Sequence, residues 1–313
     1  PRPRVLAVDT TAAPVRQADW AGTAMVLGSA VAFGTLSIFA KLAYSAGLGT
    51  EQLLAFRFVL AAIGMWVLSF VVGQSPLRLP RRKTVGLLAL GGVLYPAQAL
   101  TYFYALRTLP ASLCVLIVYI YPSLVVIAGW LFLRRRISVW HGAALALSFL
   151  GVALLVGGAQ FQLASGLIFA LAAPLCYTAF ILLGERAMSS VPAVAASATM
   201  MSATAIVLCL VAGIEGRLDL PRTGSAWAVS VGIAVIPTMV AISLFLAGLP
   251  RIGAARAALL STLEPVVTVS LAIVLLGDRF SLLQALGGVL VLLAVIVVQA
   301  AHLWRPGPPS ALR

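Results

Sequence analysis

The sequence predicts an all-α integral membrane protein in which ten transmembrane helices form two inverted five-helix repeats. Three observations support this prediction: the composition, the length of the apolar stretches and an internal repeat. The chain of 313 residues is 62% hydrophobic and 9% charged, far from the values of a soluble domain. Most charged residues lie between apolar stretches that are long enough to cross a hydrocarbon core of roughly 30 Å at about 1.5 Å per residue.

The apolar stretches fill most of the chain and leave short loops and two tails. Because lipid offers the backbone no hydrogen bonds, each stretch is expected to form a helix. Continuous apolar runs, rather than short segments that alternate in polarity, exclude a membrane β-barrel. The ten expected spans are 20–43, 51–72, 84–106, 110–133, 137–157, 163–185, 192–213, 225–247, 251–276 and 281–302.

The second half of the chain repeats the first at an offset of 143 residues, which pairs Pro122 with Pro265 and Arg136 with Arg279 without a gap. Such a repeat decides the architecture before any single motif does. Each unit holds five spans, an odd number, so the second unit must enter the membrane from the opposite side. We therefore predict a tail over 1–19, a first repeat over 20–157, a second repeat over 158–302 and a tail over 303–313.

The net charge of +13 is expected to reflect membrane topology. If the N-terminus lies in the cytoplasm, fourteen Lys and Arg residues fall on the cytoplasmic side and five on the other side. An excess of basic residues in cytoplasmic loops is the usual orientation signal of membrane proteins. We therefore expect both tails in the cytoplasm, a bacterial-type inner membrane as the location, and no nucleic-acid partner.

Residues typical of a membrane interface or of helix contacts lie along the spans. Trp20 begins the first span, and Lys41 near its end can extend toward the interface. Glu51 begins the second span, where a carboxylate suits the positive end of the helix. Small residues such as Gly287–Gly288 in the last span favour a close approach of neighbouring helices.

Prolines interrupt four spans at corresponding places in the two units. Pro96 in the third span corresponds to Pro237 in the eighth with a slip of two residues, and Pro122 in the fourth corresponds to Pro265 in the ninth. Proline removes a hydrogen-bond donor and crowds the preceding turn, so each span is expected to kink. Interrupted helices at matching places in inverted repeats indicate the binding site of a transporter.

The residues expected to line that site carry rings and uncharged polar groups. Tyr95, Gln98 and Tyr102 fall at i, i+3 and i+7 of the third span, on one helix face. Rings with hydroxyls and an amide suit an amphiphilic solute, but hydrogen bonds between helices explain the same face equally well. The neighbouring spans are expected to add Phe33, Tyr119, Tyr177 and Ser261, although the small residues around Phe33 also fit simple packing.

Among the charged residues that fall within the apolar spans, Arg57 and Glu264 bear most directly on the site. Arg57 should not face lipid, because an arginine at the centre of a membrane helix costs about 2.5–3.5 kcal/mol on insertion scales. We expect it to have a structural role and to contact carbonyls, a hydroxyl or water. Glu264 directly precedes Pro265, and we expect it to make a fixed polar contact that positions the bend. A role in proton coupling is the alternative.

Signals of catalysis or metal binding are weak. His141 and His302 lie near the ends of spans, acidic residues are isolated, and no phosphate-binding loop is present. Cys114, Cys176 and Cys209 lie within apolar spans, without the spacing of a metal site or a disulfide framework. We therefore expect no enzyme activity, no catalytic residues, no bound metal and no cofactor.

Short motifs in the last two spans add a family resemblance. The segments Leu263–Pro265 and Gly277–Asp278 look like a Leu-Glu-Pro and Gly-Glu signature, and Arg57 resembles an arginine of the second helix. Over nearly its full length the chain resembles the EamA-type branch of the drug/metabolite transporter superfamily. Its tyrosine-rich third span is similar to that of the YddG-like aromatic amino acid exporters. The resemblance implies a ten-helix export protein with a central cavity.

The chain departs from that family pattern in two places. Asp278 stands where the family has Glu, and the first span carries no acidic residue. The glutamate that couples proton movement to transport in the small multidrug relatives is therefore missing here, which argues against coupling by that route.

Together these observations predict a secondary transporter that exports aromatic or other neutral amino acids, or similar small metabolites, by alternating access through a central cavity. The alternatives are export of other amphiphilic metabolites or drugs, a channel, or a membrane receptor. Because one chain carries both units, we expect a monomer whose partners are a small-molecule substrate and the lipid bilayer.

Overall fold

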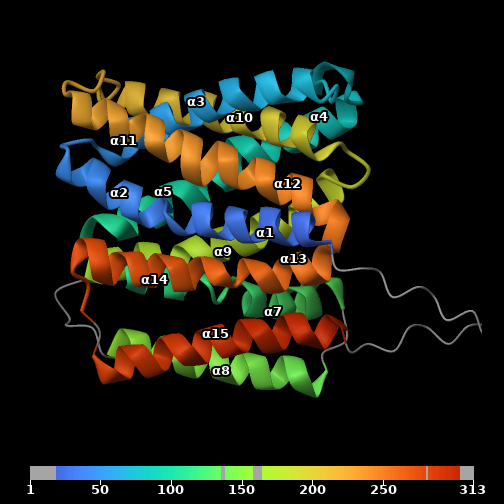
Figure 1. The fold of residues 1–313 in the computed structure, drawn as a ribbon, viewed down its shortest axis with the longest axis vertical. Coiled ribbons are helices and arrows are strands. Elements are labelled where there is room, and N and C mark those ends of the chain that lie inside the picture. Colours follow the sequence, from blue (N-terminus) through green and yellow to red (C-terminus); the bar gives the residue numbers. More distant parts are fainter. Residues whose placement is uncertain (1–18, 135–137, 158–163, 280, 304–313) are drawn as a thin grey trace, which may run out of the picture.

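The computed structural model describes residues 19–134, 138–157, 164–279 and 281–303. Within these ranges the regular elements are helical, and ten helical stretches are long and apolar enough to cross a membrane. They pack side by side in one bundle, and the described chain begins and ends at the same end of that bundle (Figure 1). The predicted all-α membrane fold with two five-helix repeats is confirmed.

In the first repeat, three of the five crossings are divided into shorter helices. The elements are α1 (Trp20–Gly34) and α2 (Leu36–Ser45); α3 (Thr50–Val71); the short η1 (Pro76–Arg78) in a loop; α4 (Arg81–Ala89), η2 (Leu90–Leu94) and α5 (Tyr95–Thr108); α6 (Ala111–Val118) and α7 (Tyr121–Leu133); and α8 (Val139–Gly157).

The second repeat has the same plan, except that its first crossing is one continuous helix. The elements are α9 (Ala164–Ala187); α10 (Ala193–Ile214); α11 (Gly224–Ala234), η4 (Val235–Val240) and α12 (Ala241–Ile252); α13 (Ala254–Ser261) and α14 (Leu263–Leu276); and α15 (Leu282–Leu303). Because each repeat has five crossings, corresponding helices of the two repeats run in opposite directions.

The interruptions follow the prolines. Both elements η2 and η4 are π-helical turns; Pro96 lies two residues after the end of η2, and Pro237 lies within η4. A proline cannot donate to the carbonyl four residues before it, so the helix widens locally to accommodate the ring. Pro122 is the second residue of α7 and Pro265 the third residue of α14, so each lies shortly after a break in the helix. The two repeats are therefore interrupted at matching places.

One predicted boundary is wrong. The eighth span was expected to end at 247, but α12 continues through Pro250 to Ile252. Gly253 then ends it with a φ of 82°, a conformation that favours glycine, and α13 begins directly afterwards. The eighth crossing is consequently longer and the ninth shorter than the apolar pattern indicated.

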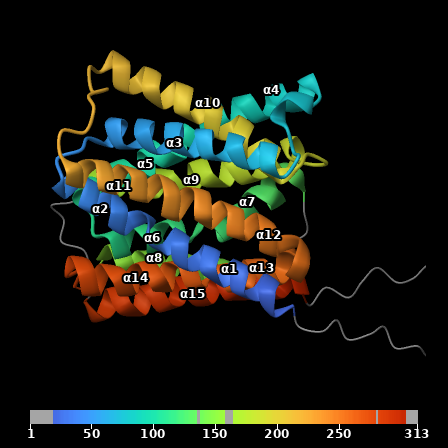
Figure 2. The ribbon, with the colours of Figure 1, turned by 45° about the horizontal axis from the view of Figure 1, so that its top comes forward.

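Glycines allow the helices at the edges of the bundle to touch. A Cβ atom on Gly287 of α15 would lie 2.6 Å from the carbonyl oxygen of Gly151 in α8. A Cβ atom on Gly91 would lie 2.3 Å from the carbonyl oxygen of Met200 in α10. These contacts pair α8 with α15 at one edge, while α10 and α3 lie at the other (Figures 1 and 2). The interrupted crossings lie between these two edges.

Candidate functional site

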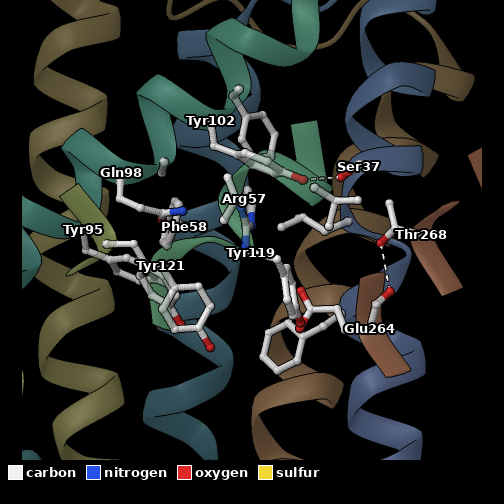
Figure 3. A pocket seen from close by; sticks show the side chains of 17 residues that line it. Ser37, Arg57, Phe58, Tyr95, Gln98, Tyr102, Tyr119, Tyr121, Glu264 and Thr268 are labelled. Atoms are coloured by element: carbon white, nitrogen blue, oxygen red, sulfur yellow. Dashed lines mark hydrogen bonds between the residues drawn. The ribbon is translucent and has the colours of Figure 1, made fainter. Parts of the chain in front are cut away.

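A cavity of about 170 Å³ lies between the two repeats (Figure 3). Its walls come from α1, α2, α3, α5, α6 and α7 of the first repeat and from α9 and α14 of the second. The structure brings together at this cavity six of the residues that the sequence suggested for a site: Phe33, Tyr95, Gln98, Tyr102, Tyr119 and Tyr177.

Ser261 is not among the lining residues. Its hydroxyl donates a hydrogen bond of 2.9 Å to the carbonyl of Ala257 within its own helix, α13. The carbonyl oxygen of Ser261 nevertheless contacts the site, because the Tyr119 hydroxyl donates to it over 3.3 Å. The backbone of Ser261, rather than the side chain expected to line the site, therefore makes the contact.

Aromatic rings form one wall of the cavity. Tyr121 meets Tyr177 edge to face, with ring centroids 4.6 Å apart and an interplanar angle of 68°. Tyr119 contacts Tyr121 at 6.0 Å in the same manner. Tyr95 stacks on Phe180 at 5.2 Å. Side chains from α5, α7, α9 and the α6–α7 break thus form a continuous group of rings that can contact the ring of a solute.

Arg57 of α3 is buried, with 5% of its surface exposed, and it lines the cavity. Its Nε donates a hydrogen bond of 2.9 Å to the Thr238 hydroxyl in η4. The centre of its guanidinium group lies 4.9 Å from the ring centroid of Phe58 and 5.5 Å from that of Phe103. The arginine is therefore held by a hydroxyl and two aromatic faces, away from lipid.

The position of Thr238 follows from the neighbouring proline. Pro237 has no N–H group to donate to the carbonyl of Ile233 four residues before it. The Thr238 hydroxyl donates to that carbonyl instead, over 2.8 Å. Its oxygen is then oriented to accept from Arg57. The interruption of the eighth crossing, in the second repeat, thus holds the guanidinium group of Arg57, which belongs to α3 of the first repeat.

The break between α13 and α14 works in a similar way. Pro265 cannot donate to the carbonyl of Ser261, which leaves this oxygen free to accept from the Tyr119 hydroxyl. Tyr119 itself lies in the corresponding break between α6 and α7. The two helix breaks therefore meet at the cavity.

Glu264, the first-turn residue of α14, lines the cavity and is partly buried. Its side chain lies within hydrogen-bonding reach of the Tyr119 hydroxyl. Its backbone carbonyl accepts from Thr268 over 3.2 Å. Thr268 also donates to the carbonyl of Gly34 over 2.8 Å, which ties α14 to α1. The side chain expected to position the bend thus faces the cavity, while backbone groups hold the bend in place.

Several lining residues were missed at the level of sequence: Ser37, Phe58, Tyr121 and Thr268. Ser37 exchanges a hydrogen bond of 2.6 Å with Tyr102, so it shares the polar side of the cavity. Tyr121 could have been found, because the offset between the repeats pairs it with Glu264. Thr268 shares a helix face with Ser261 and Glu264 at i, i+3 and i+7, which is also visible in the sequence. Ser37 and Phe58 carry no comparable signal, since serine and phenylalanine recur throughout the spans.

Two repeats with matching interruptions around one cavity are also the pattern found by comparison with known proteins. The sequence pattern of the EamA-like transporter family matches residues 20–157 and, a second time, residues 164–299. The chain belongs to the EamA-like transporter family. The family assignment agrees with the repeat read from the sequence and with the ten helices of the structure.

Relatives of this EamA-like protein are transporters by name. The uncharacterized transporter YcbK of Bacillus subtilis (strain 168) is 28% identical over 283 residues, which cover 85% of this chain and 89% of YcbK. An uncharacterized transporter of Archaeoglobus fulgidus is 26% identical over 284 residues, which cover 91% of this chain and 96% of the relative. A protein of known crystal structure matches with a TM-score of 0.63 and 21% identity over 90% of this chain and 98% of its own, which supports the fold alone.

In this EamA-like protein, polar contacts hold the helices together at the end of the bundle opposite the tails. Asp278, at the family's Gly-Glu position, accepts from the Ser112 hydroxyl over 2.6 Å and from the Ser112 backbone N–H over 3.1 Å. Ser112 is the second residue of α6, so the carboxylate caps this helix. The contact joins the loop after α14 to the first repeat.

A second contact at this end of the EamA-like bundle is centred on Glu51. Its buried carboxylate accepts a short hydrogen bond from the Tyr104 hydroxyl and pairs with Arg217 at 3.1 Å. Arg217 also pairs with Glu215 at 3.1 Å. These carboxylates raise the pKa of the Arg217 guanidinium. The pair joins the start of α3 to the segment after α10, and so links the two repeats once more.

Proposed function

We propose that this protein is a secondary transporter that exports aromatic and other bulky neutral amino acids, or closely similar metabolites, by alternating access through the central cavity. The observation that carries the proposal is the cavity itself, which lies between inverted repeats and is lined by aromatic rings with a few polar groups. Substrate sites of transporters with inverted repeats lie at this kind of interface.

The size and chemistry of the cavity favour a solute with a ring. An engineered apolar cavity of about 150 Å³ in another protein binds benzene, so a volume of about 170 Å³ is suited to one aromatic ring. Ring contacts with tyrosine side chains such as Tyr121 and Tyr177 are worth about 0.5–1.5 kcal/mol each beyond burial. An indole or a longer side chain would need the walls to move apart.

The matched helix breaks support alternating access. A helix that is interrupted near its middle can move as two halves. The fourth crossing of each repeat has such a break, between α6 and α7 in the first repeat and between α13 and α14 in the second. Because the repeats are inverted, each half of a broken crossing in one repeat lies at the opposite end of the bundle from the corresponding half in the other repeat. Movement of either pair would open the cavity to one side of the membrane.

The remaining parts of the proposal concern setting and partners. We propose that the protein lies in a bacterial-type inner membrane with both tails in the cytoplasm, as its basic residues favour. Both repeats contribute to the cavity within one chain, so a monomer suffices for transport. We propose no enzymatic activity, no metal and no cofactor.

Counterflow into proteoliposomes tests this function. Proteoliposomes that contain the purified protein and are preloaded with unlabelled phenylalanine should accumulate labelled phenylalanine saturably, whereas labelled lysine should enter slowly. Tyr95→Ala, Gln98→Ala and Tyr102→Ala should each reduce the rate, while Phe132→Ala, at an exposed position outside the cavity, should not. Equal rates for phenylalanine and lysine, or three cavity variants that all transport normally, would contradict the proposal. Flux that does not saturate would favour a channel.

A further inference from the structure

We propose that the cavity recognises the zwitterion of its substrate at two poles, with Arg57 binding the carboxylate and Glu264 receiving the ammonium group. This inference rests on the function proposed above and deepens it. Of the seventeen described residues that line the cavity, these two are the ones with ionisable acidic or basic side chains, apart from tyrosines. They stand on different repeats, on α3 and α14, and both project toward the cavity (Figure 3).

The first argument is that Arg57 lacks a countercharge. Among the described residues it forms no ion pair, although it is buried to 95%. A buried charge is normally paired or hydrogen-bonded in proteins, because transfer from water is costly. The protein satisfies Nε through Thr238 and places the aromatic faces of Phe58 and Phe103 beside the group. A negative charge from the solute would complete this environment.

The second argument is the geometry of the guanidinium group. Arginine carries five N–H donors in a planar fork, and in the described structure Thr238 engages Nε alone. The two terminal nitrogens make no hydrogen bond to the described residues and belong to a side chain that points into the cavity (Figure 3). This free edge can bind a carboxylate through two parallel hydrogen bonds, which is the favoured arrangement for this pair.

The third argument is the position of Glu264. Its oxygens lie beside the Tyr119 hydroxyl at the break before α14. They form no ion pair with the described residues. An ammonium group has three donors and no acceptor, so the Glu264 oxygens and the carbonyls of the broken helix suit it. The rings of Tyr121 and Tyr177 then remain for the side chain of the solute.

This arrangement predicts which solutes bind. Phenylalanine satisfies both poles, phenethylamine lacks the carboxylate, and 3-phenylpropionate lacks the ammonium group. Each removal should weaken binding, because Arg57 or Glu264 then lacks the opposite charge that the solute supplies. A solute with a second positive charge, such as lysine, would place it among the rings without an acidic partner.

Isothermal titration calorimetry on the purified full-length protein tests the inference with these three ligands. We expect the wild type to bind phenylalanine about tenfold or more tighter than phenethylamine, since hydrogen bonds to charged groups have this magnitude. In Arg57→Gln this ratio should fall to about one, and Arg57→Lys should restore part of it. Glu264→Gln should instead reduce the preference for phenylalanine over 3-phenylpropionate. Arg107→Gln, outside the cavity, should leave both ratios unchanged.

A purely structural role for Arg57 gives a different result. Arg57→Gln would then weaken all three ligands by the same factor, and this outcome would overturn the inference. If Arg57→Gln does not fold, the wild-type series still decides, because equal affinities for phenylalanine and phenethylamine would overturn it as well.

Leucine and its decarboxylated analogue isoamylamine separate this inference from the proposed function. In one outcome phenylalanine does not bind, leucine binds more tightly than isoamylamine, and this difference in affinity depends on Arg57. The zwitterion site then stands and the preference for aromatic solutes falls. If ring compounds bind equally with and without a carboxylate, the aromatic preference stands and the zwitterion site falls. Absence of binding by all these ligands contradicts both.

Discussion

The Nε of Arg57 donates a hydrogen bond of 2.9 Å to the Thr238 hydroxyl, and this contact connects residues 181 positions apart in the two repeats. The hydroxyl donates in turn to the carbonyl of Ile233, which cannot accept from the ring nitrogen of Pro237. A proline, a threonine and an arginine therefore act as one unit. The π-helical turn that they share lies beside the cavity, so this unit couples the shape of the eighth crossing to the electrostatics of the site.

Thr238→Val should destabilise the protein by about 1–3 kcal/mol, because it leaves the Nε of a buried guanidinium without its hydroxyl partner and removes a donor to the Ile233 carbonyl. Valine keeps the shape of threonine, so packing changes little. Thr199→Val is a matched control, since the buried Thr199 hydroxyl donates to the carbonyl of Ala195 in its own helix. Thermal unfolding in detergent measures both variants. Equal melting temperatures for the two would show that the contact with Arg57 adds nothing.

Pro265→Ala should stabilise α14 but slow transport. Alanine restores an N–H that can donate to the Ser261 carbonyl, and proline inside a helix costs up to about 3 kcal/mol relative to alanine. The same carbonyl would then be lost as an acceptor for Tyr119, and the break at which we propose that the helix moves would close. Counterflow and thermal unfolding measure the two effects.

Pro250→Ala is the control for that experiment, because Pro250 lies inside α12 and does not line the cavity. It should not slow transport. If Pro265→Ala transports at the wild-type rate, the break between α13 and α14 is not needed for movement.

Gly91→Ala should destabilise the protein by about 1–3 kcal/mol through overpacking. The added Cβ would lie 2.3 Å from the backbone oxygen of Met200, which belongs to the body of α10 and cannot move aside easily. Gly92→Ala is the control, because its Cβ would meet Val207 at 3.8 Å, an ordinary contact distance. Melting temperatures measure both. Similar values for the two variants would mean that η2 does not pack on α10 as closely as described.

Asp278→Ala should cost about 0.5–2 kcal/mol, the usual range for loss of a helix cap. The variant removes both hydrogen bonds from Ser112 and leaves the start of α6 uncapped. Asp219→Ala is the control, because its ion pair with Arg222 is exposed and should contribute little. Hydrogen exchange at the first turn of α6 localises the effect. Protection that is unchanged in Asp278→Ala would argue against the cap.

The fold could be predicted from sequence because lipid imposes a strict rule. Backbone polar groups must be satisfied within each crossing, so long apolar stretches had to be helices. The prolines then located the interruptions, since the loss of the N–H group is a local property. The end of α12 was placed wrongly because the apolar stretch was taken to end at 247, whereas the helix continues to Ile252 and Gly253 with its positive φ ends it.

The site could be predicted only where a periodic or repeated signal existed. Tyr95, Gln98 and Tyr102 share a helix face, and that spacing is visible in the sequence. The partner of Arg57 could not be predicted, because Thr238 resembles many other hydroxyls in the spans and becomes special only through its distant contact. The same holds for Ser37, which is placed by its hydrogen bond to Tyr102.

If the protein works by the alternating access proposed above, the Asp278 cap has a consequence for the balance between its two access states. The offset between the repeats pairs Asp278 with Arg135, a residue outside the described ranges and of opposite charge. A carboxylate that accepts from a helix start at one end of the bundle therefore has no chemical counterpart at the other. The two repeats are alike in shape but differ in their stabilising contacts. If each repeat took the conformation of the other, the protein would therefore have a different free energy. In the alternating-access cycle proposed above, such an inequality would give the empty protein a preferred resting side, and substrate would have to overcome that preference in every cycle.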